Sequence, residues 1–97
     1  MTKKPPLEST ITKNILKYLN GLPRCYARKI PGTRYGGGWP DIICVRNSVP
    51  IFIEVKRPKP MYRDPTELQQ RELKSWAEAG AICWVVTSVD EVRDKME

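Results

Sequence analysis

The sequence contains no histidine, and this absence excludes several classes of enzyme. Ser-His-Asp triads, zinc sites built on histidine and nucleases whose general base is histidine all need an imidazole ring. Any catalysis by this chain must therefore depend on carboxylates, lysine, tyrosine or cysteine, or on a metal ion held by oxygen ligands.

Cysteine and long apolar runs are also scarce. The three cysteines, Cys25, Cys44 and Cys83, stand far apart in apolar stretches and form no C-x-x-C pair. Such cysteines pack as small hydrophobic residues in a reduced protein, and they argue against structural zinc or disulfides. No apolar run approaches the ~20 residues that cross a bilayer, and residues 1–12 lack the apolar segment of a signal peptide.

Acidic residues are outnumbered by basic ones. The 97 residues include 17 Lys and Arg against 11 Asp and Glu, which gives a net charge of +6 and a pI of about 9.4. This length predicts one domain over residues 7–97, after a flexible lead-in over residues 1–6. The charge favours a polyanionic partner, either nucleic acid or an acidic membrane surface, over a basic surface without a partner.

Apolar periodicity predicts an α/β domain with the element order α-β-β-β-α-β-α. Helices are predicted over residues 8–20, from a cap at Asp64 or Thr66 up to Gly80, and after a Ser88-x-x-Glu91 capping box. Strands are predicted over residues 24–30, 41–46, 50–56 and 81–87, the last three as buried strands. The short Asn47-Ser48 connection implies an antiparallel hairpin, and the helix before the last strand allows a parallel crossover. We therefore expect a mixed sheet with helices on both faces.

Charged residues interrupt the predicted buried strands at one place. Glu54 follows the apolar run Ile51-Phe52-Ile53, and Lys56 lies two residues later, on the same side of the strand. Burial of such groups is costly unless they are paired or bind a metal ion. Asp41 begins the neighbouring strand, so the hairpin can bring the two carboxylates together. A divalent cation would relieve their repulsion, and Mg²⁺ prefers carboxylate and water oxygens.

The Glu-x-Lys pattern alone is weak evidence for a site. Glu72 and Lys74 repeat it on a predicted helix, where it is an ordinary surface pair. The alternative interpretation of Glu54 and Lys56 is a salt bridge at the end of the sheet.

Two helical residues agree with the metal-site interpretation. Glu8 begins the apolar stripe of the first helix, and Gln69 begins the stripe that continues to Leu73 and Trp76 on the second. Each also has a structural explanation, because Glu8 suits the first turn of a helix and Gln69 can complete a capping box with Thr66.

Together these residues resemble the VRR-NUC branch of the PD-(D/E)xK nucleases. The resemblance covers residues 7–90 and rests on a set of motifs: helical Glu8, Gly36-Gly37-Gly38 before Pro40-Asp41, then twelve residues, Glu54-Val55-Lys56, and Gln69 on the following helix. Gln70 also follows, but the helical stripe favours Gln69. The resemblance implies a single VRR-NUC-like domain with a restriction-endonuclease-like core, a central mixed sheet flanked by helices.

The resemblance also implies an activity and a set of roles. The activity is Mg²⁺- or Mn²⁺-dependent hydrolysis of DNA phosphodiester bonds, and selectivity for branched or Holliday-junction DNA is left open. Glu8, Asp41, Glu54 and the Val55 carbonyl would bind the metal ion, Lys56 would position the attacking water, and Gln69 would support the site, so that Asp41, Glu54, Lys56 and Gln69 are the candidate catalytic residues. Related stand-alone members resemble Holliday-junction resolvases and form homodimers, and a cytoplasmic location follows, either bacterial or in the host cell of a phage.

The remaining basic residues fit a DNA-binding surface. Candidate contacts are Lys29, Arg34, Tyr35, Arg57, Lys59 and Arg63. The cations would neutralise phosphates without reading bases, while Tyr35 and Trp39 are equally suited to stacking on a base and to internal packing. Two other functions stay open: a DNA-binding or assembly module without catalytic activity, and an RNA-processing enzyme.

Overall fold

The computed structural model describes residues 4–31 and 37–97, and the elements follow the predicted order. They are α1 (Glu8–Asn20), β1 (Cys25–Lys29), β2 (Ile42–Arg46), β3 (Val49–Val55), α2 (Glu67–Glu78), β4 (Ile82–Val86) and α3 (Val89–Met96). Arg34, Tyr35 and Gly36, which the sequence placed in the glycine-rich loop, lie outside the described residues.

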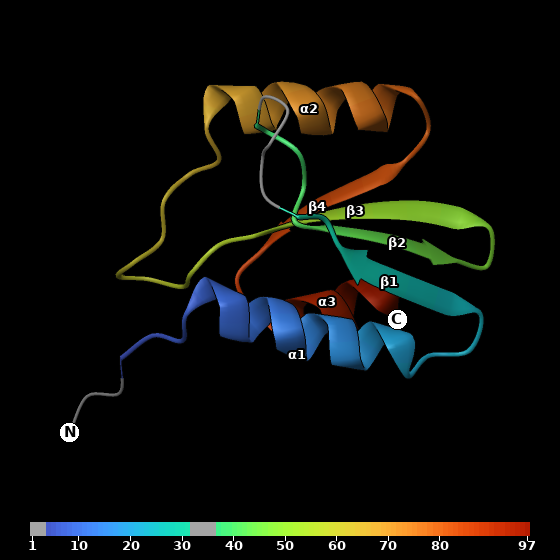
Figure 1. The fold of residues 1–97 in the computed structure, drawn as a ribbon, viewed down its shortest axis with the longest axis horizontal. Coiled ribbons are helices and arrows are strands. Elements are labelled where there is room, and N and C mark those ends of the chain that lie inside the picture. Colours follow the sequence, from blue (N-terminus) through green and yellow to red (C-terminus); the bar gives the residue numbers. More distant parts are fainter. Residues whose placement is uncertain (1–3, 32–36) are drawn as a thin grey trace.

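The sheet is mixed, as predicted. Its four strands lie in the order β1-β2-β3-β4; β1 with β2 and β2 with β3 are antiparallel, and β3 with β4 is parallel. Figure 1 shows α1 and α3 on one face and α2 on the other, so the expectation of helices on both faces is confirmed. This is the α/β architecture that the sequence predicted.

The β2–β3 hairpin has the predicted turn. Asn47 and Ser48 both have positive φ angles, 49° and 71°, which is the conformation of a two-residue type I′ turn. Such a turn sets the register, and it pairs Ile42 with Ile53.

The hydrophobic core lies between the sheet and the α1–α3 layer. The α1 stripe contributes Ile11, Ile15 and Leu19, all buried, and the sheet contributes alternate residues of β2 and the central part of β3. Cys44 is buried in this core with its sulfur 3.4 Å from that of Cys25, and all three cysteines are free. In the described part of the chain, no helix is long and apolar enough to span a membrane.

The prediction that β4 is a fully buried strand is wrong. Val86 is its only buried residue, and Ile82 keeps 40% of its surface exposed. The reason is position, because β4 is an edge strand and α2, which packs on it, has no buried residue. The main aromatic contact of α2 with the sheet is Trp76, whose ring stacks on Phe52 with centroids 4.6 Å apart.

The helix caps differ in detail from the prediction. Thr66, rather than Asp64, caps α2, so Pro65 precedes the helix instead of lying in its first turn. The Ser88 side chain accepts a hydrogen bond from the Glu91 amide as predicted, but the Glu91 carboxylate accepts from Thr87 and not from the cap residue. Both caps still begin their helices at the expected place.

Candidate active site

Four elements bring polar residues to one end of the sheet. The start of α1, the start of α2 and the end of β3 point to the same side of the molecule in Figure 1. β2 is antiparallel to β3, so its first residues also lie at this end. The candidate residues therefore share one region of the fold, although Glu8 and Gln69 are 61 positions apart in the sequence.

Asp41 is fixed against the end of β3. Its Oδ2 atom accepts a hydrogen bond of 2.7 Å from the backbone amide of Val55. The register that pairs Ile42 with Ile53 places Asp41 opposite Glu54, with both side chains on the same face of the sheet. The hairpin thus produces the two neighbouring carboxylates that the sequence pattern indicated.

Glu54 is a buried carboxylate with incomplete pairing. Only 1% of its surface is exposed, and its Oε2 atom lies 3.3 Å from the Lys56 ammonium, while Oε1 is buried without a hydrogen-bond partner. The pKa of Glu54 is raised to about 8: burial is the largest cause, the charge of Asp41 and hydrogen bonding with it also raise the pKa, and Lys56 lowers it. Two neighbouring carboxylates beside a single ammonium group favour the uptake of a proton or of a metal cation.

Lys56 is held from two sides. Its Nζ atom pairs with Glu54 and also donates a 2.9 Å hydrogen bond to Oε1 of Gln69. The same side-chain oxygen of Gln69 accepts a 2.9 Å hydrogen bond from the backbone amide of Thr66. The backbone amide of Gln69 donates to Thr66 Oγ1, which completes a capping box. The two interpretations of Gln69 from the sequence are therefore compatible, because the same side chain caps α2 and binds the Lys56 ammonium. Gln70 instead donates to the Pro65 carbonyl.

Glu8 stands at the rim of this cluster. It is exposed on the first turn of α1, yet partial burial and then the charge of Asp41 raise its pKa, while Lys56 and Lys29 lower it. Glu8 thus lies within electrostatic reach of the cluster without a hydrogen bond to it among the described contacts.

Gly38 connects the glycine-rich loop to α2, a contact that the sequence did not reveal beyond the run of glycines. Its φ angle is +82°, and a Cβ atom there would lie 2.6 Å from Cγ of Leu68 and 2.9 Å from the Leu68 carbonyl oxygen. Only glycine tolerates both the conformation and the contact. The chain three residues before Asp41 is therefore packed against the residue that precedes Gln69.

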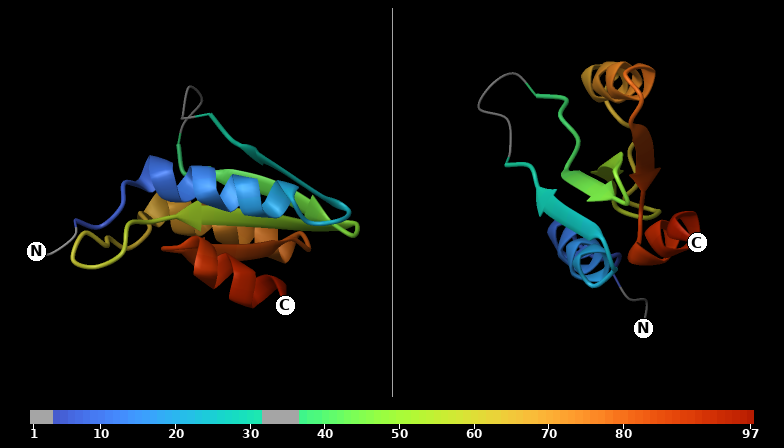
Figure 2. Two further views of the ribbon diagram at one scale, coloured as in Figure 1. Left: turned by 90° about the horizontal axis from the view of Figure 1, so that it is seen from below. Right: turned by 90° about the vertical axis from the view of Figure 1, so that its right-hand side faces the viewer.

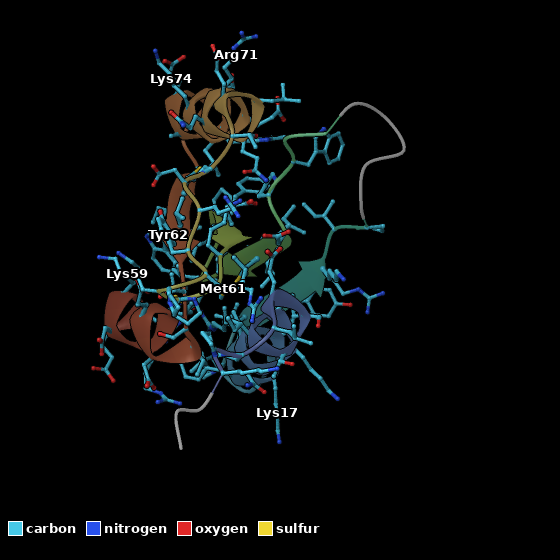
Figure 3. The ribbon with its side chains drawn as sticks, turned by 90° about the vertical axis from the view of Figure 1, so that its left-hand side faces the viewer. Lys17, Lys59, Met61, Tyr62, Arg71 and Lys74 are labelled. Atoms are coloured by element: carbon cyan, nitrogen blue, oxygen red, sulfur yellow. The ribbon has the colours of Figure 1, made fainter. Side chains whose placement is uncertain are left out.

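The proposed DNA-contacting residues have different surroundings. Lys29, Lys59 and Arg63 are exposed, and Figure 3 shows Lys59 pointing outward from the segment between β3 and α2. Arg57 is half-buried and donates hydrogen bonds to the carbonyls of Pro5 and Pro6, a role that the sequence did not indicate. Trp39 is 52% exposed, so it is available for stacking.

The donor set fits a hard divalent cation. Among the residues that the structure describes, no three Asp, Glu, Cys or His side chains lie close enough to form a complete metal cage. Asp41 and Glu54 nevertheless supply two adjacent carboxylates, and the buried Glu54 Oε1 lacks the partner that a cation would provide. Mg²⁺ commonly binds proteins through one or two carboxylates and keeps several waters, so a complete cage is not required.

Comparison with known proteins supports the fold. No protein-family model matches the sequence, and the curated proteins gave no match. One solved structure, described as "VRR_NUC domain", has a TM-score of 0.74 and 27% identity and covers 92% of both chains. These findings support assignment of the chain to the VRR-NUC family. A second, "VRR_NUC domain protein", has a TM-score of 0.74 and 17% identity, covers 97% of this chain and 88% of that chain, and shows the shared fold.

The VRR-NUC assignment indicates a nuclease-type activity. The region where β2, β3 and α2 meet holds the Asp41 and Glu54 carboxylates beside the Lys56 ammonium.

Proposed function

We propose that this VRR-NUC chain is a Mg²⁺- or Mn²⁺-dependent endonuclease that hydrolyses phosphodiester bonds in DNA. One observation carries the proposal: the buried Glu54 has one unpartnered oxygen beside Asp41, at the place where Lys56 is fixed by Gln69. A buried carboxylate oxygen without a partner costs stability, and a divalent cation shared with Asp41 would supply that partner.

Each residue has a defined part in this mechanism. Asp41 and Glu54 would hold the ion, with Glu8 and the Val55 carbonyl as further ligands, directly or through water. The bound ion would lower the pKa of a water ligand and offset charge on the scissile phosphate. Lys56 donates hydrogen bonds and carries a positive charge, so it can orient the attacking water and stabilise the developing phosphate charge. Gln69 keeps the Lys56 ammonium in place by accepting its 2.9 Å hydrogen bond at the side-chain oxygen Oε1.

The exposed cations support a DNA substrate. Lys29, Lys59 and Arg63, together with the net charge of +6, can neutralise backbone phosphates around the cut. Arg34 and Tyr35 stay predictions, because they lie outside the described residues. The cytoplasm is the compartment that we propose, since the three cysteines are free.

A homodimer would suit a branched substrate, because two active sites can cut two strands. The half of the sheet that α2 leaves uncovered supports dimerisation, since it presents the exposed apolar side chains Tyr26, Ile43 and Val45. Exposed apolar side chains that gather on one face, here beside the cationic Arg28, are typical of a protein interface. We therefore propose a homodimer whose preferred DNA is branched, with four-way junctions as the test substrate.

The test is cleavage of linear, flapped and four-way DNA with Mg²⁺ or Mn²⁺, comparing Lys56→Ala with Lys74→Ala. Lys74 lies on α2 with 77% of its side chain exposed and pairs with Glu78, so Lys74→Ala removes the same charge as Lys56→Ala at a position away from the site. Lys56→Ala should lower the cleavage rate by about 100-fold or more, and Lys74→Ala should keep the wild-type rate. Metal-independent binding of DNA without cleavage of any substrate would instead favour the non-catalytic module, and cleavage of matched RNA alone would favour RNA processing.

A further inference from the structure

Arg57 is tied to the segment that precedes α1. Its Nε atom donates a 3.1 Å hydrogen bond to the Pro6 carbonyl, and its Nη2 atom donates a 3.0 Å hydrogen bond to the Pro5 carbonyl. The two contacts join positions 51 and 52 residues apart, and Arg57 directly follows Lys56. A guanidinium group is a rigid planar fork, so two bonds fix both the position and the direction of the segment.

The start of α1 needs such a constraint. Leu7 stands at the N-cap, where it makes no side-chain hydrogen bond, and leucine is a poor cap. The two preceding prolines have no backbone N–H, so their carbonyls are the groups through which neighbouring residues can hold this backbone. Arg57 uses both carbonyls. The direction in which the chain enters α1 is therefore set by a residue at the end of β3 rather than by a local cap.

The residue that gains from this arrangement is Glu8. It is the first residue of α1, two positions after Pro6, and it lies within electrostatic reach of Asp41 and Lys56. Because Glu8 is exposed and makes no hydrogen bond of its own in the described part of the chain, packing does not determine where its carboxylate lies.

We propose that Arg57 is a positioning residue, which keeps Glu8 within electrostatic reach of Asp41 through the carbonyls of Pro5 and Pro6. The inference rests on the proposed metal site. It also changes the role of Arg57, whose guanidinium serves the protein's own backbone instead of a DNA phosphate. Asp41 and Glu54 would bind the ion directly. Glu8 would contribute to the ion's ligand shell only while Arg57 holds the backbone at Pro5 and Pro6.

The first experiment measures Mn²⁺ binding to the whole chain without DNA, from the electron paramagnetic resonance signal of the free ion. Arg57→Lys keeps the positive charge but cannot bind two carbonyls with a planar fork. We expect Arg57→Lys and Glu8→Gln each to weaken Mn²⁺ binding on the order of 10-fold, as changes around a metal site typically do. The double variant should bind Mn²⁺ no more weakly than Glu8→Gln alone, because Arg57 acts on the ion only through Glu8. Arg71→Lys is the matched control, since Arg71 lies on α2, is 73% exposed and points away from the sheet in Figure 3.

The second readout is amide hydrogen exchange at the first turn of α1. The amides of Thr10 and Ile11 both donate to the Leu7 carbonyl. Loss of the Arg57 hydrogen bonds to Pro5 and Pro6 should therefore speed the exchange of these amides in Arg57→Lys and not in Arg71→Lys. Unchanged exchange, or additive losses of Mn²⁺ affinity in the double variant, would overturn the proposal. If Arg57→Lys keeps full affinity for both Mn²⁺ and DNA while Arg57→Gln loses only DNA binding, Arg57 is a phosphate contact instead.

Failure of the metal site itself would give a different result. Glu54→Gln serves as the check, because it removes the charge of the buried carboxylate. If Glu54→Gln, Glu8→Gln and Arg57→Lys all leave Mn²⁺ binding unchanged, the proposed function is wrong. If only Arg57→Lys leaves it unchanged, the site stands and the positioning role of Arg57 is wrong.

Discussion

Glu54 links the stability of the metal-free protein to pH. Burial is the largest cause of its raised pKa, which is about 8 in the folded state against 4.5 for the free side chain. A group whose pKa rises on folding stabilises the fold fully below its unfolded pKa, and this contribution is lost as pH rises through the folded pKa. With a chelator present, the free energy of unfolding should therefore fall between pH 4.5 and about 8. Each unit of the pKa difference contributes about 1.4 kcal/mol to this fall.

Urea denaturation across this pH range, in wild type, Glu54→Gln and Glu78→Gln, measures the effect. Glu54→Gln should flatten the dependence on pH. Glu78 keeps 68% of its side chain exposed, so Glu78→Gln should retain the wild-type slope. Added Mn²⁺ should stabilise the wild type most at the alkaline end, where the carboxylate is ionised and free to bind it. Equal slopes in wild type and Glu54→Gln would contradict the assignment of this pH dependence to Glu54.

The sequence predicted the residues of the site better than their contacts. Asp41, Glu54 and Lys56 could be found because strand alternation and a two-residue hairpin place them together. The capping box of Gln69 follows from its local spacing to Thr66, but its contact with Lys56 depends on where α2 lies over the sheet, which no local pattern contains. The Arg57 contacts with Pro5 and Pro6 join residues about 50 positions apart through backbone carbonyls, which carry no sequence signal.

At the scale of elements, the free edge of β1 is protected by a side chain of α1. The Asn20 amide group accepts a 2.8 Å hydrogen bond from the Ala27 N–H and donates a 3.0 Å bond to the Ala27 carbonyl. These are the backbone groups that face away from β2 on an edge strand, where another chain could otherwise pair. Asn20 therefore takes the place of a neighbouring strand.

Replacing Asn20 by alanine should destabilise the protein and expose this edge. Loss of two hydrogen bonds should lower the free energy of unfolding by about 1–3 kcal/mol. Light scattering should also show faster, concentration-dependent aggregation near the unfolding midpoint. Asn14→Ala, at an exposed position on the same helix, is the control and should do neither. Equal stability of the two variants would show that the edge does not depend on Asn20.

The same scale explains which elements the sequence described well. α1 matches its predicted bounds, because its stripe of Ile11, Ile15 and Leu19 meets the core directly. β4 was expected to be buried because its residues are apolar, but burial depends on the helix above it. α2 covers this part of the sheet without burying any of its own residues, so apolar composition overstated the burial of β4.

At the scale of the whole molecule, the face of the sheet beside α2 is only half covered. In Figure 2, α2 lies over the β4 side of the sheet, and β1 is at a distance from it. Tyr26 on β1 and Ile43 and Val45 on β2 point to this uncovered side and keep 64%, 39% and 46% of their surface exposed. A chain of 97 residues has a small core, so burial of this surface between two copies would add stability as well as a second active site.

A charge placed on this surface should therefore dissociate the proposed homodimer. Val45→Lys puts an ammonium group at the centre of the uncovered face, where the partner would have to desolvate it. Val49→Lys is the matched control, because Val49 is 39% exposed and lies near the same hairpin turn but points to the opposite face. Sedimentation velocity should give a dimer for wild type and Val49→Lys and a monomer for Val45→Lys. The proposed active site lies at the other end of β2 and β3. Monomeric Val45→Lys should therefore still cut single strands in the presence of metal, and it should lose the paired cuts of a four-way junction. A dimeric Val45→Lys, or a wild type that is monomeric at every concentration tested, would remove this face from the proposal and leave the active site unaffected.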